Sequence, residues 1–262
     1  MFCGKRLRDR GTVLAYNGAI AEKYRNVRCG WTGRIKWKGR MAMNIFDVVG
    51  PVMVGPSSSH TAGAVRIGNV SRKLLGEEPA EAKIGLHGSF LATGAGHGTD
   101  RALIAGLLGL SVDDYRIPDS FSLARERGLH FSFHPVDLGE NAHPNSAKLE
   151  LKSRSGRELE VVGASVGGGR ISIRELDGLE ANFSGDYPTL IVHNLDQPGH
   201  VAEVTSMLSH KGVNIATMQL YRSGRGGYAV MILECDQEIP EEGVKWLEHL
   251  EGVVKVTYYS LL

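Results

Sequence analysis

A cluster of three serines, a histidine and a threonine, Ser57 to Thr61, carries the clearest chemical signal in this sequence of 262 residues. It stands between an apolar run that ends at Val54 and a segment, 62–75, whose apolar residues recur at helical spacing. Gly76 follows, and glycine is favoured just after the end of a helix. The spacing therefore predicts a helix over 62–75 with the hydroxyl cluster at its N-terminus.

Three interpretations of this cluster are open. Serine and threonine are favoured N-caps, so Ser57, Ser58 and Ser59 can form no more than an elaborate cap. The N–H groups and dipole of a helix start also favour an anion, and the hydroxyls with His60 and Thr61 would add specificity for a carboxylate or phosphate. A Ser/His nucleophile pair is the third interpretation. It is disfavoured because sequence neighbours rarely point at each other and no G-x-S-x-G turn is present.

A glycine-rich segment, 88–98, follows a predicted short strand over 82–88 and precedes a predicted helix over 101–108. Its G-x-G-x-G spacing is not that of a dinucleotide-binding turn. We expect a tight loop that brings His97, Thr99 and Asp100 to the start of this helix, with Thr99 or Asp100 as its cap. Two helix N-termini would then converge on one pocket.

From residue 130 the hydrophobic period changes to two, which predicts strands. The segments are 129–135, 147–152, 158–162 and 170–174, with a hairpin turn at 153–156. We expect an antiparallel sheet packed by the helices on one face. The loop 141–146 holds His143 and Asn145, which either form turn chemistry or belong to the site.

The C-terminal part reads as a second domain of a protein in the α+β class. Residues 175–187 are the expected linker, and the pattern over 187–262 is strand, helix, strand, strand, helix, strand. This βαββαβ order is typical of a ferredoxin-like unit. The sequence thus predicts two domains, over 43–180 and 187–262.

Residues 1–42 form a basic leader with eleven Lys or Arg and two acidic residues, whereas the remainder has 19 basic and 27 acidic residues. The mildly acidic body argues against nucleic acid as a main partner. The leader is open to three interpretations: an organelle transit peptide, an arm that touches nucleic acid or a membrane surface, or an extension upstream of a start at Met41 or Met43. We favour the last and expect the leader not to be part of the fold.

Cysteine usage and hydropathy indicate the cellular environment of the protein. Cys3, Cys29 and Cys235 are too scattered for a disulfide framework and form no C-x-x-C pair, which predicts a reducing, cytoplasmic protein. No apolar run approaches the roughly 18 residues that a membrane span needs. We expect no metal ligands in this chain, no nucleic acid and no membrane as partners.

The βαββαβ tail resembles an ACT domain, a small amino-acid-sensing module. The resemblance is carried by residues 196–199, before the first helix of the tail, and by residues 212–215 after it. In that family the effector binds at the first strand-to-helix loop and a neighbouring strand, usually across a domain pair. The resemblance implies an ACT-mediated dimer and effector-binding roles for Asn194, Asp196, Gly199 and Asn214, although Asp196 replaces the amide common in serine-sensing relatives.

Residues 43–180 resemble the beta chain of the bacterial iron–sulfur L-serine dehydratase. The matching motifs are V-G-P-S-S-S-H-T-A-G at 54–63, G-S-F-L-A-T-G-A-G-H-G-T-D at 88–100 and H-P-N at 143–145. The resemblance implies conversion of L-serine to pyruvate and ammonia, with a [4Fe–4S] cluster held by the cysteines of a partner alpha chain. Three dispersed cysteines cannot hold such a cluster themselves, which agrees with that implication.

The resemblance also implies a mechanism and roles for residues. Lewis-acid elimination would remove the serine hydroxyl, and a base, not identified by the sequence, would take the α-proton. We expect catalytic roles for Ser59, His60 and Thr61. Substrate-binding roles are expected for Ser57, Ser58, His97, Thr99, Asp100, His143 and Asn145.

Two other functions remain open from the sequence. The chain can be a non-catalytic amino-acid sensor that regulates a partner. It can also be a cofactor-free hydrolase that uses Ser and His. Sequence alone does not distinguish serine from threonine as the substrate.

Overall fold

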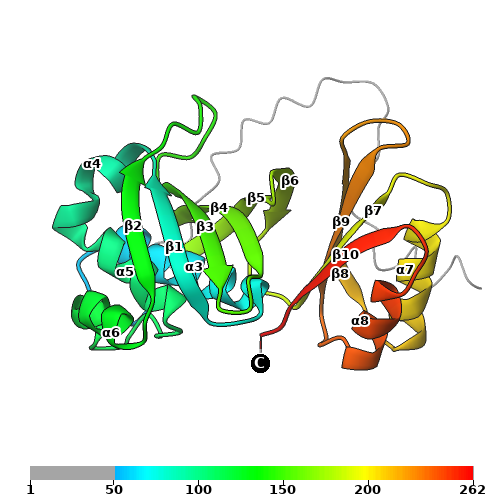
Figure 1. Cartoon of the computed structure of the whole chain (residues 1–262), viewed down its shortest axis with the longest axis horizontal. Coiled ribbons are helices and arrows are strands. Elements are labelled where there is room, and N and C mark those ends of the chain that lie inside the picture. Colours follow the sequence, from blue (N-terminus) through cyan, green and yellow to red (C-terminus); the bar gives the residue numbers. More distant parts are fainter. Residues whose placement is uncertain (1–50, 262) are drawn as a thin grey trace, which may run out of the picture. The chain divides into compact units, whose positions relative to one another are not determined.

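The computed structural model describes residues 51–261, and the expected leader at 1–42 lies outside them. Within the described residues, the strands form a six-stranded sheet and a four-stranded sheet, each with helices packed on it (Figure 1). The first sheet contains β1 (Pro79–Leu86), β2 (His130–Pro135), β3 (Ser146–Ser153), β4 (Glu158–Gly167), β5 (Arg170–Leu176) and β6 (Leu179–Phe183). The expected α+β class is confirmed.

The helix predicted after the serine cluster is confirmed, and it begins earlier than expected. A short π-helical turn, η1 (Ser58–Ala62), continues directly into α3 (Gly63–Leu75). The helix buries its apolar face, including Ile67 and Leu74, against the sheet. It ends at Gly76, whose φ of 76° is the left-handed conformation that glycine adopts without strain.

The first sheet has the strand order β2-β1-β3-β4-β5-β6. All neighbouring pairs are antiparallel except β1 and β2, which run parallel. The expectation of a purely antiparallel sheet is therefore wrong at this edge. A parallel pair requires a long crossover, and the helices between β1 and β2 supply it. They are α4 (Gly88–His97), α5 (Thr99–Leu107), the 3-10 turn η2 (Ile117–Asp119) and α6 (Ser120–Glu126).

The glycine-rich segment after β1 is a helix, α4, and not the expected loop. Two features explain this. The backbone N–H groups of Ser89 and Phe90 donate to the carbonyl of Pro144, at 2.7 and 3.4 Å, which satisfies donors of the first helical turn. The Phe90 side chain is fully buried and anchors the helix to the core. Neither Thr99 nor Asp100 caps α5; the cap position is Gly98, with a φ of 69°.

Helices α3 and α5 pack backbone against backbone where they cross, at two glycines. A Cβ atom on Gly68 would overlap the backbone at Leu103 and Leu107, and one on Gly106 would overlap the backbone at Val65 and Asn69. Only glycine fits at such a crossing without displacing a helix. The glycines therefore fix the spacing of the two helices that lead to the Ser57–Thr61 cluster and to Thr99.

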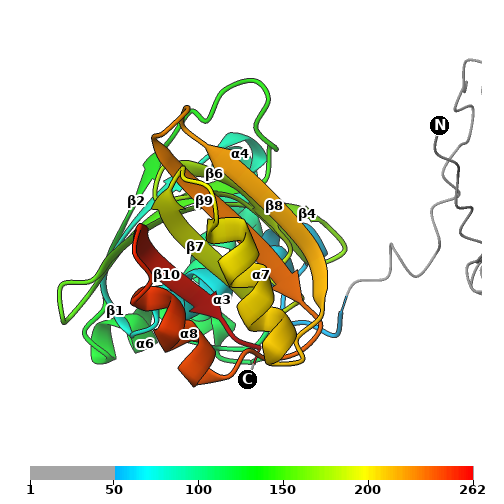
Figure 2. The same ribbon diagram turned by 90° about the vertical axis from the view of Figure 1, so that its right-hand side faces the viewer.

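The second sheet has the order β10-β7-β9-β8, the arrangement of a ferredoxin-like domain. Its elements are β7 (Thr189–Leu195), α7 (His200–His210), β8 (Ile215–Arg222), β9 (Tyr228–Cys235), α8 (Glu241–Glu248) and β10 (Val253–Tyr259). Helices α7 and α8 cover one face of this sheet (Figure 2), where Leu190, Val192 and Leu208 are fully buried. The predicted βαββαβ order is confirmed.

The segment 175–187, expected as a linker, contains most of a hairpin. Strand β5 continues to Leu176, and β6 pairs back on it from Leu179 to Phe183. Asp177 and Gly178 form the turn, with φ values of 50° and 76°. Alternation in this segment is hidden because the turn residues dominate its composition.

Candidate active site

The start of α3 positions the hydroxyl cluster. Ser57 is the N-cap: its backbone is extended, and its Oγ accepts the backbone N–H of His60 at 3.1 Å. Ser58 and Ser59 form the first turn with their side chains partly buried. A helix start leaves the first N–H groups without intrahelical acceptors. One serine therefore serves as the cap, and the other two remain beside free backbone donors.

Helix α4 brings two further hydroxyls to this cluster that the sequence analysis did not assign. The hydroxyl of Ser89 lies 3.1 Å and that of Thr93 lies 3.0 Å from Nε2 of His60. Residues four apart share one face of a helix. The Ser89/Thr93 pair would have been found from that spacing, had the segment been recognised as helical.

His60 lies at the centre of the cluster, partly buried and in contact with two other rings. Its Nδ1 lies 3.4 Å from the Oγ of Ser57. The ring centroid is 5.4 Å from that of Phe90 and 4.9 Å from that of His97. Burial lowers the pKa of His60 below its ordinary value of 6.5, and the charge of His97 lowers it further. His60 is thus held in its neutral form at about physiological pH.

Residues Thr61, His97 and Thr99 link the two helices at the base of the cluster. Thr61 is 1% exposed, and its hydroxyl donates to the backbone carbonyl of His97 at 3.3 Å. Thr99 is fully buried, and its hydroxyl has no hydrogen-bond partner among the described residues. Nδ1 of His97 is also buried and has no hydrogen-bond partner among the described residues. The expected convergence of His60 and His97 is present, although His97 comes from the last turn of α4.

Asp100 lies in the first turn of α5 and is partly buried. Its carboxylate accepts the backbone N–H of Arg101 at 2.8 Å. An acidic residue in the first turn also complements the helix dipole. The contacts of Asp100 are therefore those of a helix-stabilising residue, and no described contact joins it to His60.

The loop with His143 and Asn145 reaches the cluster through Pro144, whose carbonyl receives the first N–H groups of α4. Nδ1 of His143 accepts the backbone N–H of Asn145 at 3.1 Å. The hydroxyl of Ser146 donates to the His143 carbonyl at 2.6 Å. Burial, followed by the charge of Arg174, lowers the pKa of His143. The loop thus flanks Ser89 at the start of α4.

Ser165, near the end of β4, lies directly under the start of α3. It is fully buried, its hydroxyl has no partner among the described residues, and its backbone N–H donates to the carbonyl of Asn145 at 2.9 Å. A Cβ atom on Gly63 would overlap the Ser165 side chain. This contact joins the sheet, the 143–145 loop and α3 at one point.

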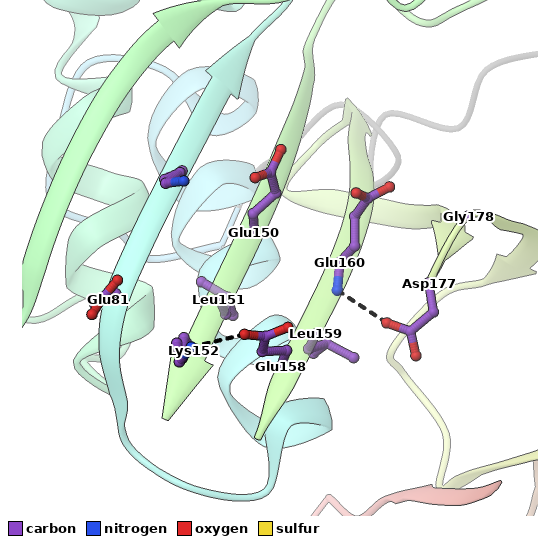
Figure 3. A pocket seen from close by; sticks show the side chains of 10 residues that line it. Glu81, Glu150, Leu151, Lys152, Glu158, Leu159, Glu160, Asp177 and Gly178 are labelled. Atoms are coloured by element: carbon purple, nitrogen blue, oxygen red, sulfur yellow. Dashed lines mark hydrogen bonds and ion pairs between the residues drawn. The ribbon is translucent and has the colours of Figure 1, made fainter. Parts of the chain in front are cut away.

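A separate hollow lies on the open face of the first sheet (Figure 3). In this view the helices lie behind the strands, and charged side chains project forward from β1, β3 and β4. Two ion pairs lie at this face: Lys152 with Glu158 at 2.9 Å, and Glu160 with Lys148 at 3.0 Å. No residue assigned to the site from the sequence lines this hollow.

The residues expected to bind an effector lie at two ends of the second sheet. Asn194 and Asp196 are at the C-terminal end of β7, and Gly199 precedes α7 with a φ of 112°. Asp196 accepts the backbone N–H of Gly226 at 3.1 Å. Asn214 is at the opposite end, where its side-chain amide donates to Asp236 at 2.6 Å. Within one chain, Asn214 is therefore separate from the other three.

The described residues contain no group of three or more His, Cys, Asp or Glu placed to hold a metal ion. Cys235 is the cysteine within residues 51–261; it is buried, and burial raises the pKa of its thiol to about 11. Iron–sulfur clusters are held by several thiolates, so this part of the chain does not fit one. None of the helices in the same range is long and apolar enough to cross a membrane.

Two sequence families match the chain. The ACT domain family matches residues 188–250, and the family described as serine dehydratase beta chain matches residues 43–127. Together with the βαββαβ topology, the first match identifies the C-terminal domain as an ACT domain.

The relatives that match over most of their length define the family more closely. The chain is 42% identical over 214 residues to the probable L-serine dehydratase, beta chain, of Bacillus subtilis (strain 168), covering 82% of this chain and 96% of that one. It is 40% identical over 196 residues to the L-serine dehydratase, beta chain, of Peptoniphilus asaccharolyticus, covering 75% and 88%. The chain belongs to the L-serine dehydratase beta-chain family.

A third relative has a different name. D-3-phosphoglycerate dehydrogenase of Methanocaldococcus jannaschii is 24% identical over 227 residues, covering 86% of this chain and 42% of that one. The chain thus resembles less than half of a longer protein in that case.

Proposed function

We propose that this chain is the beta subunit of an L-serine dehydratase, which converts L-serine to pyruvate and ammonia together with an alpha chain. The proposal rests on one observation: His60, held neutral and surrounded by hydroxyls, lies at a helix start in a chain of this family. The non-catalytic sensor is not favoured, because the relatives matched over most of their length are named as enzyme chains.

In this proposal the substrate carboxylate binds at the start of α3. The free N–H groups of the first turn and the hydroxyls of Ser58 and Ser59 are donors, which suit an anion. Ser57 is occupied as the cap and contributes by fixing the turn. Among the residues expected to bind substrate, His97 contacts His60, and His143 and Asn145 belong to the loop whose Pro144 carbonyl accepts the first N–H groups of α4. Thr99 and Asp100 lie at the start of α5.

His60 is the residue of this chain best suited to accept a proton. A general base must be unprotonated at the working pH, and burial together with His97 lowers the pKa of His60. Thr61 supports it by binding the carbonyl of His97. Variants of His60 in the complete enzyme test whether this residue accepts the α-proton.

The cofactor of the proposed enzyme is a [4Fe–4S] cluster ligated by the alpha chain. Residues 51–261 have one cysteine, buried as a neutral thiol, and do not fit this role. The proposed location is the cytoplasm, and the proposed partners include neither nucleic acid nor a membrane. The contribution assigned to this chain is binding, orientation and proton transfer.

We also propose that the ACT domain forms a dimer through the exposed edge strand β8. Met218 and Leu220 on this strand are 37% and 50% exposed. In an antiparallel pair of β8 strands, the start of one strand lies beside the end of the other. Asn214 of one chain would then approach Arg222 and Asp196 of the other, which are 3.4 Å apart. That arrangement would assemble the four expected effector residues.

Anaerobic co-expression of the full chain with an L-serine dehydratase alpha chain, followed by a pyruvate-release assay on L-serine, tests the proposal. We expect turnover that requires both chains and is lost in air. A stable complex that binds L-serine without releasing pyruvate would overturn the enzyme function and favour the sensor. L-threonine in the same assay determines the substrate preference.

A further inference from the structure

The two ring nitrogens of His60 face different partners. Nδ1 faces the hydroxyl of Ser57, and Nε2 faces the hydroxyls of Ser89 and Thr93. A neutral imidazole carries its proton on one nitrogen, and the partners of the two nitrogens decide which one. The contacts around His60 therefore contain information about its tautomer.

The contacts of Thr93 favour an acceptor role toward His60. Its hydroxyl lies 2.9 Å from the backbone carbonyl of Ser89, one turn earlier in α4, and a carbonyl can only accept. The single hydroxyl proton of Thr93 is directed to that carbonyl. Its oxygen is then left to accept from Nε2 of His60 at 3.0 Å. In this arrangement the proton of the imidazole is on Nε2.

Ser57 completes the same pattern on the other side of the ring. Its oxygen accepts the backbone N–H of His60 at 3.1 Å, which leaves the hydroxyl proton to point elsewhere. Nδ1 lies 3.4 Å from this oxygen. With the proton on Nε2, Nδ1 has a lone pair that faces the Ser57 hydroxyl. The contacts of Ser57, Thr93 and both ring nitrogens are compatible with this tautomer.

The surroundings of His60 favour the neutral ring to which this tautomer belongs. The titratable group that faces His60 is His97, from the last turn of α4, and its charge opposes a second positive charge nearby. The remaining contacts, from η1 and α4, are the uncharged side chains of Ser57, Ser89, Phe90 and Thr93. No described carboxylate contacts the ring.

We propose that Thr93 is a positioning residue, whose hydroxyl holds His60 as the Nε2–H tautomer with Nδ1 directed at the start of α3. Nδ1 is then the atom of His60 that accepts a proton. This role rests on the proposed function only where it concerns turnover. The tautomer itself is a property of the chain alone and is measured without substrate or partner.

The test is ¹⁵N NMR of the full chain labelled at histidine, because the shifts of the two ring nitrogens report the tautomer. His60 is assigned from the signals missing in His60→Gln. In the wild-type chain above the pKa of His60, we expect one tautomer with the proton on Nε2. In Thr93→Val, which keeps the shape and removes the hydroxyl, we expect both tautomers and a lower pKa, because the imidazolium also loses an acceptor.

Two variants make the comparison specific. Thr93→Ser retains a hydroxyl and should restore the wild-type shifts. Thr205→Val removes a threonine hydroxyl that also donates to the carbonyl four residues earlier, that of Val201 at 2.7 Å, but on α7 of the ACT domain. It should leave His60 unchanged. A proton on Nδ1 in the wild-type chain, or an unchanged tautomer in a folded Thr93→Val chain, would overturn the proposal.

Turnover provides a second test of the role of Thr93. In the complex with the alpha chain, Thr93→Val should lower kcat/KM about tenfold, roughly the contribution of one hydrogen bond, and shift the acid limb of the pH profile to lower pH. If the wild-type complex releases no pyruvate, the proposed function fails while the NMR result stands. If it is active and Thr93→Val leaves the tautomer unchanged, the inference alone fails.

Discussion

The His60 cluster and the charged hollow on the first sheet are both rich in polar residues, and they differ in how these residues are neutralised. In the hollow Lys152 forms an ion pair with Glu158. Around His60 the partners are hydroxyls and a second histidine, with no described carboxylate in contact. The two regions thus differ in how their polar groups are partnered: an ion pair is present in the hollow, and hydroxyls contact His60.

The pKa directions express the same difference. The hydrogen bond from Lys152 lowers the pKa of Glu158, and the same bond raises the pKa of Lys152, so both groups are held in their charged forms. Burial lowers the pKa of His60 and holds it in its uncharged form. A neutral imidazole can accept a proton at about physiological pH. An ion pair on an exposed face, in contrast, contributes little to the stability of the fold.

The largest expected effect is the loss of turnover in His60→Gln. General acid–base groups typically contribute about 10²- to 10⁴-fold, so kcat in the complex with the alpha chain should fall by at least about 100-fold. The matched control is His210→Gln on α7, whose ring lies in the ACT domain with Nδ1 2.7 Å from the carbonyl of Ser206. It should retain wild-type kcat. Near-normal turnover by a folded His60→Gln complex would remove His60 from the site.

Gly63→Ala should disturb the site through its packing. The added methyl group would overlap the buried side chain of Ser165, and overpacking of this kind costs about 1–3 kcal/mol of unfolding free energy. Chemical unfolding measures the loss, and turnover should fall with it because η1 must shift. In a Ser165→Gly background the obstruction is gone, so Gly63→Ala should cost clearly less there. Equal costs in both backgrounds would contradict this contact.

The pH dependence of the unfolding free energy should distinguish the His60 cluster from the charged hollow. His60 has a lower pKa folded than unfolded, so the unfolded chain binds more protons and the unfolding free energy falls as pH decreases below 6.5. His143 and His193 act in the same direction through burial. Denaturation between about pH 7.5 and 5.5 should show a shallower slope in His60→Gln. Superimposable slopes would argue against a lowered pKa at His60.

The smallest effect is expected in the hollow. Glu158→Gln removes an exposed ion pair with Lys152, and such pairs contribute little to stability. The lowered pKa of Glu158 stabilises the fold above its unfolded value of 4.5, and this is lost only as pH falls below it. The unfolding midpoint near neutral pH and the turnover of the complex should both match the wild type. A loss of activity would make the hollow a functional surface.

The sequence predicted the elements whose signals are local. The helix that ends at Gly76 follows from its periodicity and its terminal glycine, and the strands follow from their alternation. The convergence of His60 and His97 was also expected, since each lies beside a helix start. Local patterns identified the second sheet for the same reason, and its strand order followed from the βαββαβ topology.

What the sequence could not predict depends on partners distant along the chain. Helix α4 carries three glycines in its second half or just after it, and its first N–H groups rely on Pro144, more than fifty residues away. With α4 read as a loop, the shared face of Ser89 and Thr93 could not be seen. The buried contact between Gly63 and Ser165 joins residues about a hundred positions apart and has no local signal.

The glycine crossing of α3 and α5 has a consequence for how this site can change over generations. Each glycine is opposed by the backbone of the other helix, so no second substitution can make room for a larger residue at Gly68 or Gly106. The hydroxyls around His60 can be exchanged one at a time, since each is a separate side chain. The separation of α3 and α5 leaves no such freedom, so the start of α3 beside His60 stands on a frame of fixed dimensions while the chemistry around it can vary.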